Sequence, residues 1–156
     1  MKTVEIAKYI IANNDLMTVA TANQDGKPWV SPVGYTFDKD YNLYWVSHKD
    51  AIHSENVRLK PEVAIVIVGN NPDGNMDGVY FDATAVELND VTELPAAIEL
   101  VDSRNKDAKY VIGSVENATG DAAWRIYKAT PKSVWKRKDD ISGGQAVTVR
   151  EKVDLV

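Results

Sequence analysis

The chain has 156 residues, of which 44% are hydrophobic and 26% charged, and this composition is typical of a single folded globular domain. Its net charge of −5 argues against a general affinity for nucleic acid or for an anionic membrane surface, so any bound anion must be held by a local cluster. Because the sequence has no cysteine, disulfides, thiol catalysis and cysteine metal ligands are excluded.

The beginning of the chain, MKTVEIAKYI, does not resemble a secretory signal, because a glutamate interrupts its apolar run. No segment reaches the length of about 20 apolar residues that a membrane-spanning helix needs. We therefore expect a cytoplasmic protein that does not bind membranes.

The first part of the chain predicts a helix followed by a hairpin. Residues 3–14 place apolar side chains at helical spacing, and Thr3 can cap this helix. Residues 16–22 and 29–37 predict two strands of a hairpin. Asp25-Gly26 lies between them, and glycine accepts the positive φ that a tight turn requires.

The second of these strands has an interrupted pattern. Pro32 has no N–H to donate to a neighbouring strand, and Gly34 has no side chain to pack. Neither residue is typical of a central strand. We therefore predict an interrupted ladder here, with backbone groups left free to approach a ligand.

Polar side chains gather where a third strand gives way to a helix. The strand begins at Leu43, and the helix follows Asp50, which we expect to cap it. The joint contains both histidines of the sequence with a lysine and two serines, namely Ser47, His48, Lys49, His53 and Ser54. A strand-to-helix junction offers unpaired N–H groups and the positive end of a helix dipole, so the joint is predicted to hold an anion such as a phosphate.

His53 has a plainer interpretation, as a partly buried histidine that is hydrogen-bonded within the fold. An isolated histidine favours that interpretation, whereas the nearby Ser47, Lys49 and Ser54 favour anion binding. His48 faces the opposite side of the strand from Ser47 and is expected to be structural or exposed. No metal site is predicted, because the spacing of the two histidines across the joint gives no facing pair.

The remainder of the chain predicts further strands and one more helix. A helix capped by Thr92 covers residues 92–104, whereas residues 105–120 are compatible with either strand or helix. Residues 69–78 are rich in Asn, Pro, Asp and Gly and predict a long loop. Pro131 is expected to separate two of the strands, and the predicted strands span residues 63–68, 79–88, 124–130, 133–138 and 146–149.

Two groups of charged residues are expected to lie on the surface. Glu55 and Arg58 are spaced as a solvated pair on the short helix. The basic run 136–138 is followed at once by Asp139-Asp140. This pattern predicts an exposed strand edge that is protected by charge, and it does not predict a basic binding patch.

Six or more short strands, mostly joined by hairpins, favour a mainly β (α+β) fold. A doubly wound parallel sheet would need a helix after nearly every strand, and the first three predicted strands have none between them. We therefore expect one domain over residues 1–156, built as a small antiparallel barrel with peripheral helices.

Several short motifs occur in a fixed order along the first half of the chain: Ala20-Thr21, DGKPWVSPV at 25–33, LYWVS at 43–47, HSENV at 53–57 and VAIVIV at 63–68. Their order and spacing resemble the pyridoxamine 5'-phosphate oxidase-like superfamily of FMN-binding split barrels. The resemblance covers residues 1–90 well and the remainder by general layout. It implies a six-stranded antiparallel split barrel that forms a homodimer, with FMN in each cleft at the subunit interface.

For the flavin ring, the resemblance implies a place along the second strand, against Ser31, Pro32 and Val33. The interrupted pattern of that strand agrees with this use. In the family, the partner subunit supplies a late residue to the ring. Trp124 and Trp135 are both candidates for that residue.

For the FMN phosphate, the resemblance implies the hydroxyl of Ser47 and the imidazole of His53 as ligands. Family members usually carry a further basic residue just upstream, where this sequence has Ala51-Ile52. Lys49 can reach the phosphate from the loop instead. Together with Ser54, these residues complete the predicted cofactor-binding set.

The resemblance implies a flavin-dependent oxidoreductase that passes electrons from NADH or NADPH to a small-molecule acceptor. The flavin carries the redox chemistry, and the sequence presents no acid–base pair that would act as catalytic residues. Pyridoxamine phosphate oxidase activity itself is not expected, because its Arg-x-His pair near the C-terminus is missing and no histidine follows His53. Two alternatives stay open: a non-catalytic FMN carrier or sensor, and a split barrel that uses haem or another cofactor.

Overall fold

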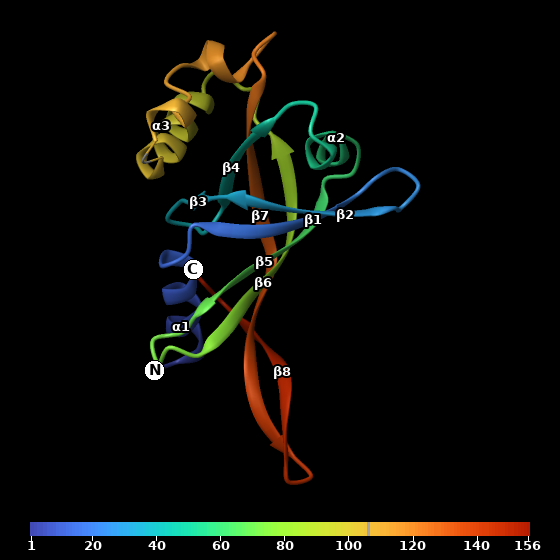
Figure 1. Ribbon diagram of the computed structural model, residues 1–156, viewed down its shortest axis with the longest axis vertical. Coiled ribbons are helices and arrows are strands. Elements are labelled where there is room, and N and C mark those ends of the chain that lie inside the picture. Colours follow the sequence, from blue (N-terminus) through green and yellow to red (C-terminus); the bar gives the residue numbers. More distant parts are fainter. Residues whose placement is uncertain (106) are drawn as a thin grey trace.

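The computed structural model describes residues 1–105 and 107–156. Within them the fold is mainly β, with one curled antiparallel sheet and three α-helices at its periphery (Figure 1). The α-helices are α1 (Thr3–Ala12), α2 (Ile52–Leu59) and α3 (Leu94–Arg104), and the short 3-10 helices are η1 (Ala108–Tyr110) and η2 (Val115–Ala118). The strands are β1 (Leu16–Ala22), β2 (Pro28–Gly34), β3 (Thr36–Phe37), β4 (Leu43–His48), β5 (Glu62–Asn70), β6 (Met76–Glu87), β7 (Trp124–Ser142) and β8 (Gln145–Val153).

The two ends of the sheet are joined by the short piece of chain between β2 and β3. Its hydrogen-bonded order is β2-β1-β5-β6-β7-β4-β3, and β8 pairs with β7 outside this order. β2 and β3 therefore stand at opposite ends of the order, yet only Tyr35 separates them in the sequence. The sheet must curl until its two ends meet, which confirms the predicted antiparallel barrel with peripheral helices.

The described residues form an eight-stranded sheet, not the six-stranded one expected. One reason is that the predicted strand 29–37 is broken at Tyr35 into β2 and β3. Another is that the end of the chain forms a long strand, β8, which pairs with β7 and extends away from the barrel with it (Figure 1). The predicted loop 69–78 is also shorter, since β5 and β6 continue into it and pair as far as Asn70 and Met76.

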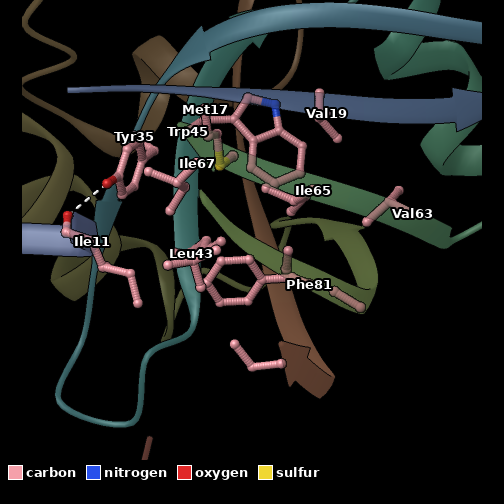
Figure 2. Packing of buried hydrophobic residues seen from close by; sticks show 14 of the residues in the cluster. Ile11, Met17, Val19, Tyr35, Leu43, Trp45, Val63, Ile65, Ile67 and Phe81 are labelled. Carbon is pink, nitrogen blue, oxygen red and sulfur yellow. Dashed lines mark hydrogen bonds between the residues drawn. The ribbon is translucent and has the colours of Figure 1, made fainter. Parts of the chain in front are cut away.

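The core lies inside the barrel, where alternate residues of neighbouring strands converge. Figure 2 shows Met17, Trp45, Ile65 and Phe81 turned toward one another. Tyr35 points to the same interior, and its hydroxyl donates a 2.6 Å hydrogen bond to the carbonyl oxygen of Ile11 in α1 (Figure 2). Burial raises the pKa of Tyr35 well above its usual value, so the phenol stays protonated and acts as a donor. The residue that links the sheet edges thus also fastens α1 to the barrel.

The predicted helix caps are each wrong by one position. α1 follows Lys2 at its N-cap position, and the Lys2 N–H donates to the Glu5 carboxylate over 2.9 Å. α3 begins at Leu94, because the N–H and hydroxyl of Thr92 both donate to Asp90 in the preceding turn. Thr92 therefore closes the turn before α3 and does not cap the helix.

The predicted break at Pro131 is also wrong, because β7 continues through it without interruption. Ser133 lies opposite Asp82, and Pro131 lies opposite Ala83, so Lys132 is an extra residue on β7. A bulge tolerates proline because the missing N–H is not needed for the ladder there.

Residues 105–120, which the sequence allows as strand or helix, contain no strand in their described part and only short 3-10 helices. These helices are η1 and η2, and residue 106 lies outside the described residues. Ile112 and Ala118 are buried here against α3 in a second apolar cluster, separate from the barrel core. No helix in the described part of the chain is long and apolar enough to cross a bilayer.

The prediction that the charged strand edge is wholly exposed is wrong for Lys136. Its side chain is buried, and its ammonium lies 2.5 Å from the carboxylate of Asp77, which is buried as well. Lys138, Asp139 and Asp140 are exposed as predicted, because they lie on the β7–β8 arm beyond the barrel.

Asp77→Asn is expected to lower the free energy of unfolding by about 3–5 kcal/mol, because it leaves the Lys136 ammonium buried without a counter-charge. Urea denaturation measures this loss. The matched control is Asp82→Asn, which breaks the half-exposed Lys132–Asp82 pair between the same two strands and should cost less than about 1 kcal/mol. Equal losses in the two variants would contradict the assignment of a buried pair.

Candidate cofactor site

Ser47 and His53 come together where β4 ends and α2 begins. Ser47 shares the inner face of β4 with Leu43 and Trp45, and it is buried. His53 lies in the first turn of α2, and its Nε2 is 2.7 Å from the Ser47 Oγ, a hydrogen bond whose donor depends on the imidazole tautomer. The two predicted phosphate ligands therefore lie side by side, one from the strand and one from the helix.

Ser54 and Lys49 occupy different positions at the same joint. Ser54 is fully buried, and its hydroxyl donates to the carbonyl oxygen of His48 over 2.8 Å, which fastens α2 to the end of β4. The Lys49 N–H donates to the carbonyl oxygen of Ala123 over 2.8 Å. The Lys49 carbonyl oxygen accepts a 2.6 Å hydrogen bond from Arg58. The backbone of Lys49 is therefore held from both sides, while Ser54 serves the structure of the joint.

The first turn of α2 lacks the side-chain cap that we expected from Asp50. The N-cap residue is Ala51, whose side chain has no acceptor. The Asp50 N–H instead donates to Nδ1 of His48 over 3.1 Å. Because a helix cannot satisfy its first N–H groups internally, those of Ile52 and His53 are candidates for an external acceptor, whereas Ser54 is fully buried. An alanine cap is about 1 kcal/mol less favourable than a serine or aspartate cap, and an anion placed here would compensate for it.

His53 is neutral at pH 7 in this setting. Burial lowers the pKa of its imidazole below the ordinary value of 6.5. The neighbouring arginines are engaged elsewhere: Arg58 pairs with Glu87 over 2.8 Å, and the buried Arg125 donates to the carbonyl oxygens of Gly120, Ala122 and Trp124. Lys49, which follows β4 directly and is partly buried, is the basic residue that we predicted at this joint.

The predicted ring-binding residues of β2 point in two directions. Ser31 and Val33 face the interior, and the Ser31 hydroxyl accepts a 3.0 Å hydrogen bond from Nε1 of Trp29. Pro32 is exposed on the opposite face with Val30, whose side chain is 58% exposed. β2 stands at one end of the sheet order, where proline is tolerated because its missing N–H faces away from the neighbouring strand. The outer edge of β2 therefore offers backbone groups and apolar surface to a flat ligand.

β2 and the joint are neighbours in space, because α2 packs on the β1–β2 hairpin. Asn56 of α2 donates a buried 3.0 Å hydrogen bond to the hydroxyl of Thr21 in β1, and Thr21 lies opposite Trp29 of β2 in the ladder. Figure 1 shows α2 beside the hairpin at the end of β4. One surface thus carries the candidate phosphate ligands and the exposed face of β2.

Sequence reasoning missed the partners that hold α2 in place. Arg58 was expected to form a solvated pair with Glu55, but it pairs with Glu87 of β6. The Glu87 carboxylate also accepts a 2.9 Å hydrogen bond from Tyr127 of β7. No local pattern reports these contacts, because they join segments at least 29 residues apart.

Trp124 and Trp135, the two late candidates for the ring, lie in different settings. Trp124 is opposite His48 in the ladder between β4 and β7, and the two rings meet edge to face with centroids 6.1 Å apart. It also lines a cavity of about 530 Å³ between β4, α3 and the β2–β3 junction. Trp135 lies farther along β7, opposite Tyr80 of β6, and is partly buried. Trp124 is therefore the one beside the candidate site of its own subunit.

A family model described as pyridoxamine 5'-phosphate oxidase matches residues 4–138. The chain belongs to this family. The family includes oxidoreductases and also haem-binding proteins that are not enzymes. No curated protein sequence matches the chain.

Solved structures of the same fold differ in what they bind. The haem storage protein HutZ from Vibrio cholerae aligns with a TM-score of 0.68 and 16% identity, over 85% of this chain and 92% of HutZ. A haem-binding protein from Mycobacterium smegmatis aligns with a TM-score of 0.68 and 20% identity, over 96% of this chain and 58% of that protein. An FAD-binding protein from Mesorhizobium loti aligns with a TM-score of 0.65 and 20% identity, over 86% and 92% of the two chains. At these identities the likeness shows the split-barrel fold alone.

The lowered pKa of His53 predicts a pH-dependent stability of this family member. In the unfolded chain the imidazole takes up a proton near pH 6.5, whereas in the folded protein it does so only at lower pH. The neutral imidazole therefore makes its full contribution to the free energy of unfolding above about pH 6.5. This contribution is lost as the pH falls from 6.5 toward the pKa of the folded state. Urea denaturation at pH 7.5 and pH 5.5 should show a drop in wild type that is smaller in His53→Gln. An equal drop in both proteins would contradict the assignment.

Proposed function

We propose that the chain binds FMN, with the phosphate at the β4–α2 joint and the flavin ring along the outer edge of β2. The observation that carries this proposal is the Ser47–His53 pair beside the uncapped first turn of α2. A hydroxyl, an imidazole and open backbone N–H groups can all donate hydrogen bonds to phosphate oxygens. FMN, a phosphate ester with a flat ring, would use both parts of this surface.

The charge at the joint fits a phosphate that is bound mainly by hydrogen bonds. Lys49 supplies one positive charge, and family members usually have a further basic residue where Ala51-Ile52 stand here. Binding of a dianion would favour protonated His53, so the site would take up a proton together with the ligand. We therefore expect FMN affinity to increase as the pH is lowered from 8 toward 6.

The bound flavin would supply hydride and electron transfer between NADH or NADPH and a small-molecule acceptor. The residues of this chain would orient the ring and limit the access of water to it. The 530 Å³ cavity beside Trp124 is large enough for a small acceptor, since ligand pockets are about 300–1,000 Å³. The proposed enzyme is thus a flavin-dependent oxidoreductase without an acid–base pair of its own.

We further propose that the protein acts as a homodimer with the cofactor at the subunit interface. On the outer face of β2, Val30 leaves 58% of its surface exposed, and Pro32 is exposed beside it. A second copy placed over this face would bury the exposed apolar groups and cover the ring. Trp124 or Trp135 of the second copy is the candidate for contact with the ring.

Purified protein should show flavin absorption or gain it on titration with FMN. His53→Ala is expected to raise the FMN dissociation constant by about 10–100-fold, which corresponds to the loss of one charge-assisted hydrogen bond of about 1.5–3 kcal/mol. Fluorescence titration at pH 6 and pH 8 measures both this loss and the pH dependence. His48→Ala is the matched control and should bind FMN as wild type does, because His48 is exposed on the other face of β4. An unchanged dissociation constant in His53→Ala would remove His53 from the site.

Two further measurements separate the proposed enzyme from its alternatives. Stopped-flow reduction of the flavin by NADH or NADPH supports an oxidoreductase, whereas a bound flavin that is not reduced supports a carrier or sensor. Haem binding is the second candidate, because two similar structures are haem proteins by name. A protein that takes up haem, and that gains no thermal stability from FMN, would favour it.

A further inference from the structure

Arg58 connects the joint to the interior of the barrel. One of its terminal nitrogens donates to the Glu87 carboxylate over 2.8 Å, and the other donates to the carbonyl oxygen of Lys49 over 2.6 Å. The same Glu87 oxygen, Oε1, accepts the hydroxyl of Tyr127 over 2.9 Å. The contacts form one chain from β7 through β6 and α2 to the residue that follows β4.

The inner end of this chain is rigid. Tyr127 is completely buried and stacks on Trp45, with ring centroids 5.3 Å apart. Burial raises the pKa of Tyr127 to about 12, so its hydroxyl remains a donor to Glu87 at neutral pH. Glu87 is 13% exposed as a side chain, whereas Arg58 is 35% exposed. The carboxylate is therefore the fixed element, and it determines where the guanidinium lies.

The outer end of the chain determines the geometry of the predicted anion site. The Lys49 N–H is already held by Ala123, and the Arg58 contact holds the carbonyl side of the same residue. The open N–H groups of α2 begin only three residues later, at Ile52. Fixing the Lys49 backbone thus fixes the base of its side chain relative to these donors.

We infer that Glu87 is a positioning residue for the phosphate of the bound cofactor, acting through Arg58 on the Lys49 backbone. This inference rests on the proposed FMN site. Glu87 also neutralises Arg58, so that this guanidinium serves the joint and leaves the phosphate to Ser47, His53 and Lys49. Neither role involves contact between Glu87 and the cofactor.

The test compares FMN with riboflavin, which has the same ring but no phosphate. Glu87→Gln keeps the size of the side chain and an acceptor for Tyr127, but it removes the charge that holds Arg58. We expect the FMN dissociation constant to rise about tenfold and the riboflavin constant to stay unchanged. A purely structural defect would weaken both ligands alike, so the ratio of the two constants is the informative readout.

Arg58→Met provides an independent variant should Glu87→Gln fold poorly, because it keeps the Glu87–Tyr127 hydrogen bond and removes only the outer contacts. It should show the same selective loss of FMN binding. The matched control is Glu93→Gln, which breaks the Lys128–Glu93 pair outside the joint and should leave the ratio at the wild-type value.

The possible failures are distinguishable. A wild-type protein that binds FMN no better than riboflavin would overturn the phosphate site, and this inference with it. A wild type that prefers FMN, together with Glu87→Gln and Arg58→Met variants of unchanged preference, would overturn the positioning role alone. Tighter FMN binding in Glu87→Gln would also overturn it, because a released Arg58 would then be a better phosphate ligand than a fixed one.

Discussion

Tyr35 is the single residue between β2 and β3, and these strands stand at opposite ends of the hydrogen-bonded order of the sheet. Because this link is so short, the sheet cannot stay flat. Its two ends must approach each other and enclose the barrel core. The buried phenol completes the constraint by donating to Ile11 of α1. Because the barrel is closed in this way, the exposed edge of β2 and the β4–α2 joint lie on one surface, and the candidate site exists only there.

The arginine side chains around the joint are bonded to other groups of the protein. Arg58 is held by Glu87, and Arg125 is committed to backbone carbonyls, so neither is an open cation. His53 is kept neutral by burial. The positive potential at the joint therefore comes from Lys49 and from the first turn of α2. A ligand bound here would be recognised by hydrogen-bond geometry more than by net charge, which agrees with a protein whose overall charge is −5.

The split barrel supports more than one chemistry. Proteins named for haem storage, haem binding and FAD binding share this fold with the chain at 16–20% identity. Function in such a family is decided by the residues placed on the barrel and not by the barrel itself. In this chain the candidate site is made by the Ser47–His53 pair, the alanine at the N-cap of α2 and the proline on the outer edge of β2.

The sequence by itself determined the strand and helix order, the β1–β2 turn and the polar joint after β4, because alternation, helical spacing and turn residues are local properties. It even indicated that Ser47 and His53 belong together, since few residues separate them. Only the tertiary structure decided that Lys136 is buried with Asp77 and that Arg58 pairs with Glu87, across 59 and 29 residues of sequence. Such pairs depend on the register of strands that are distant in the chain, and on how the closed sheet brings them together, which no local pattern encodes.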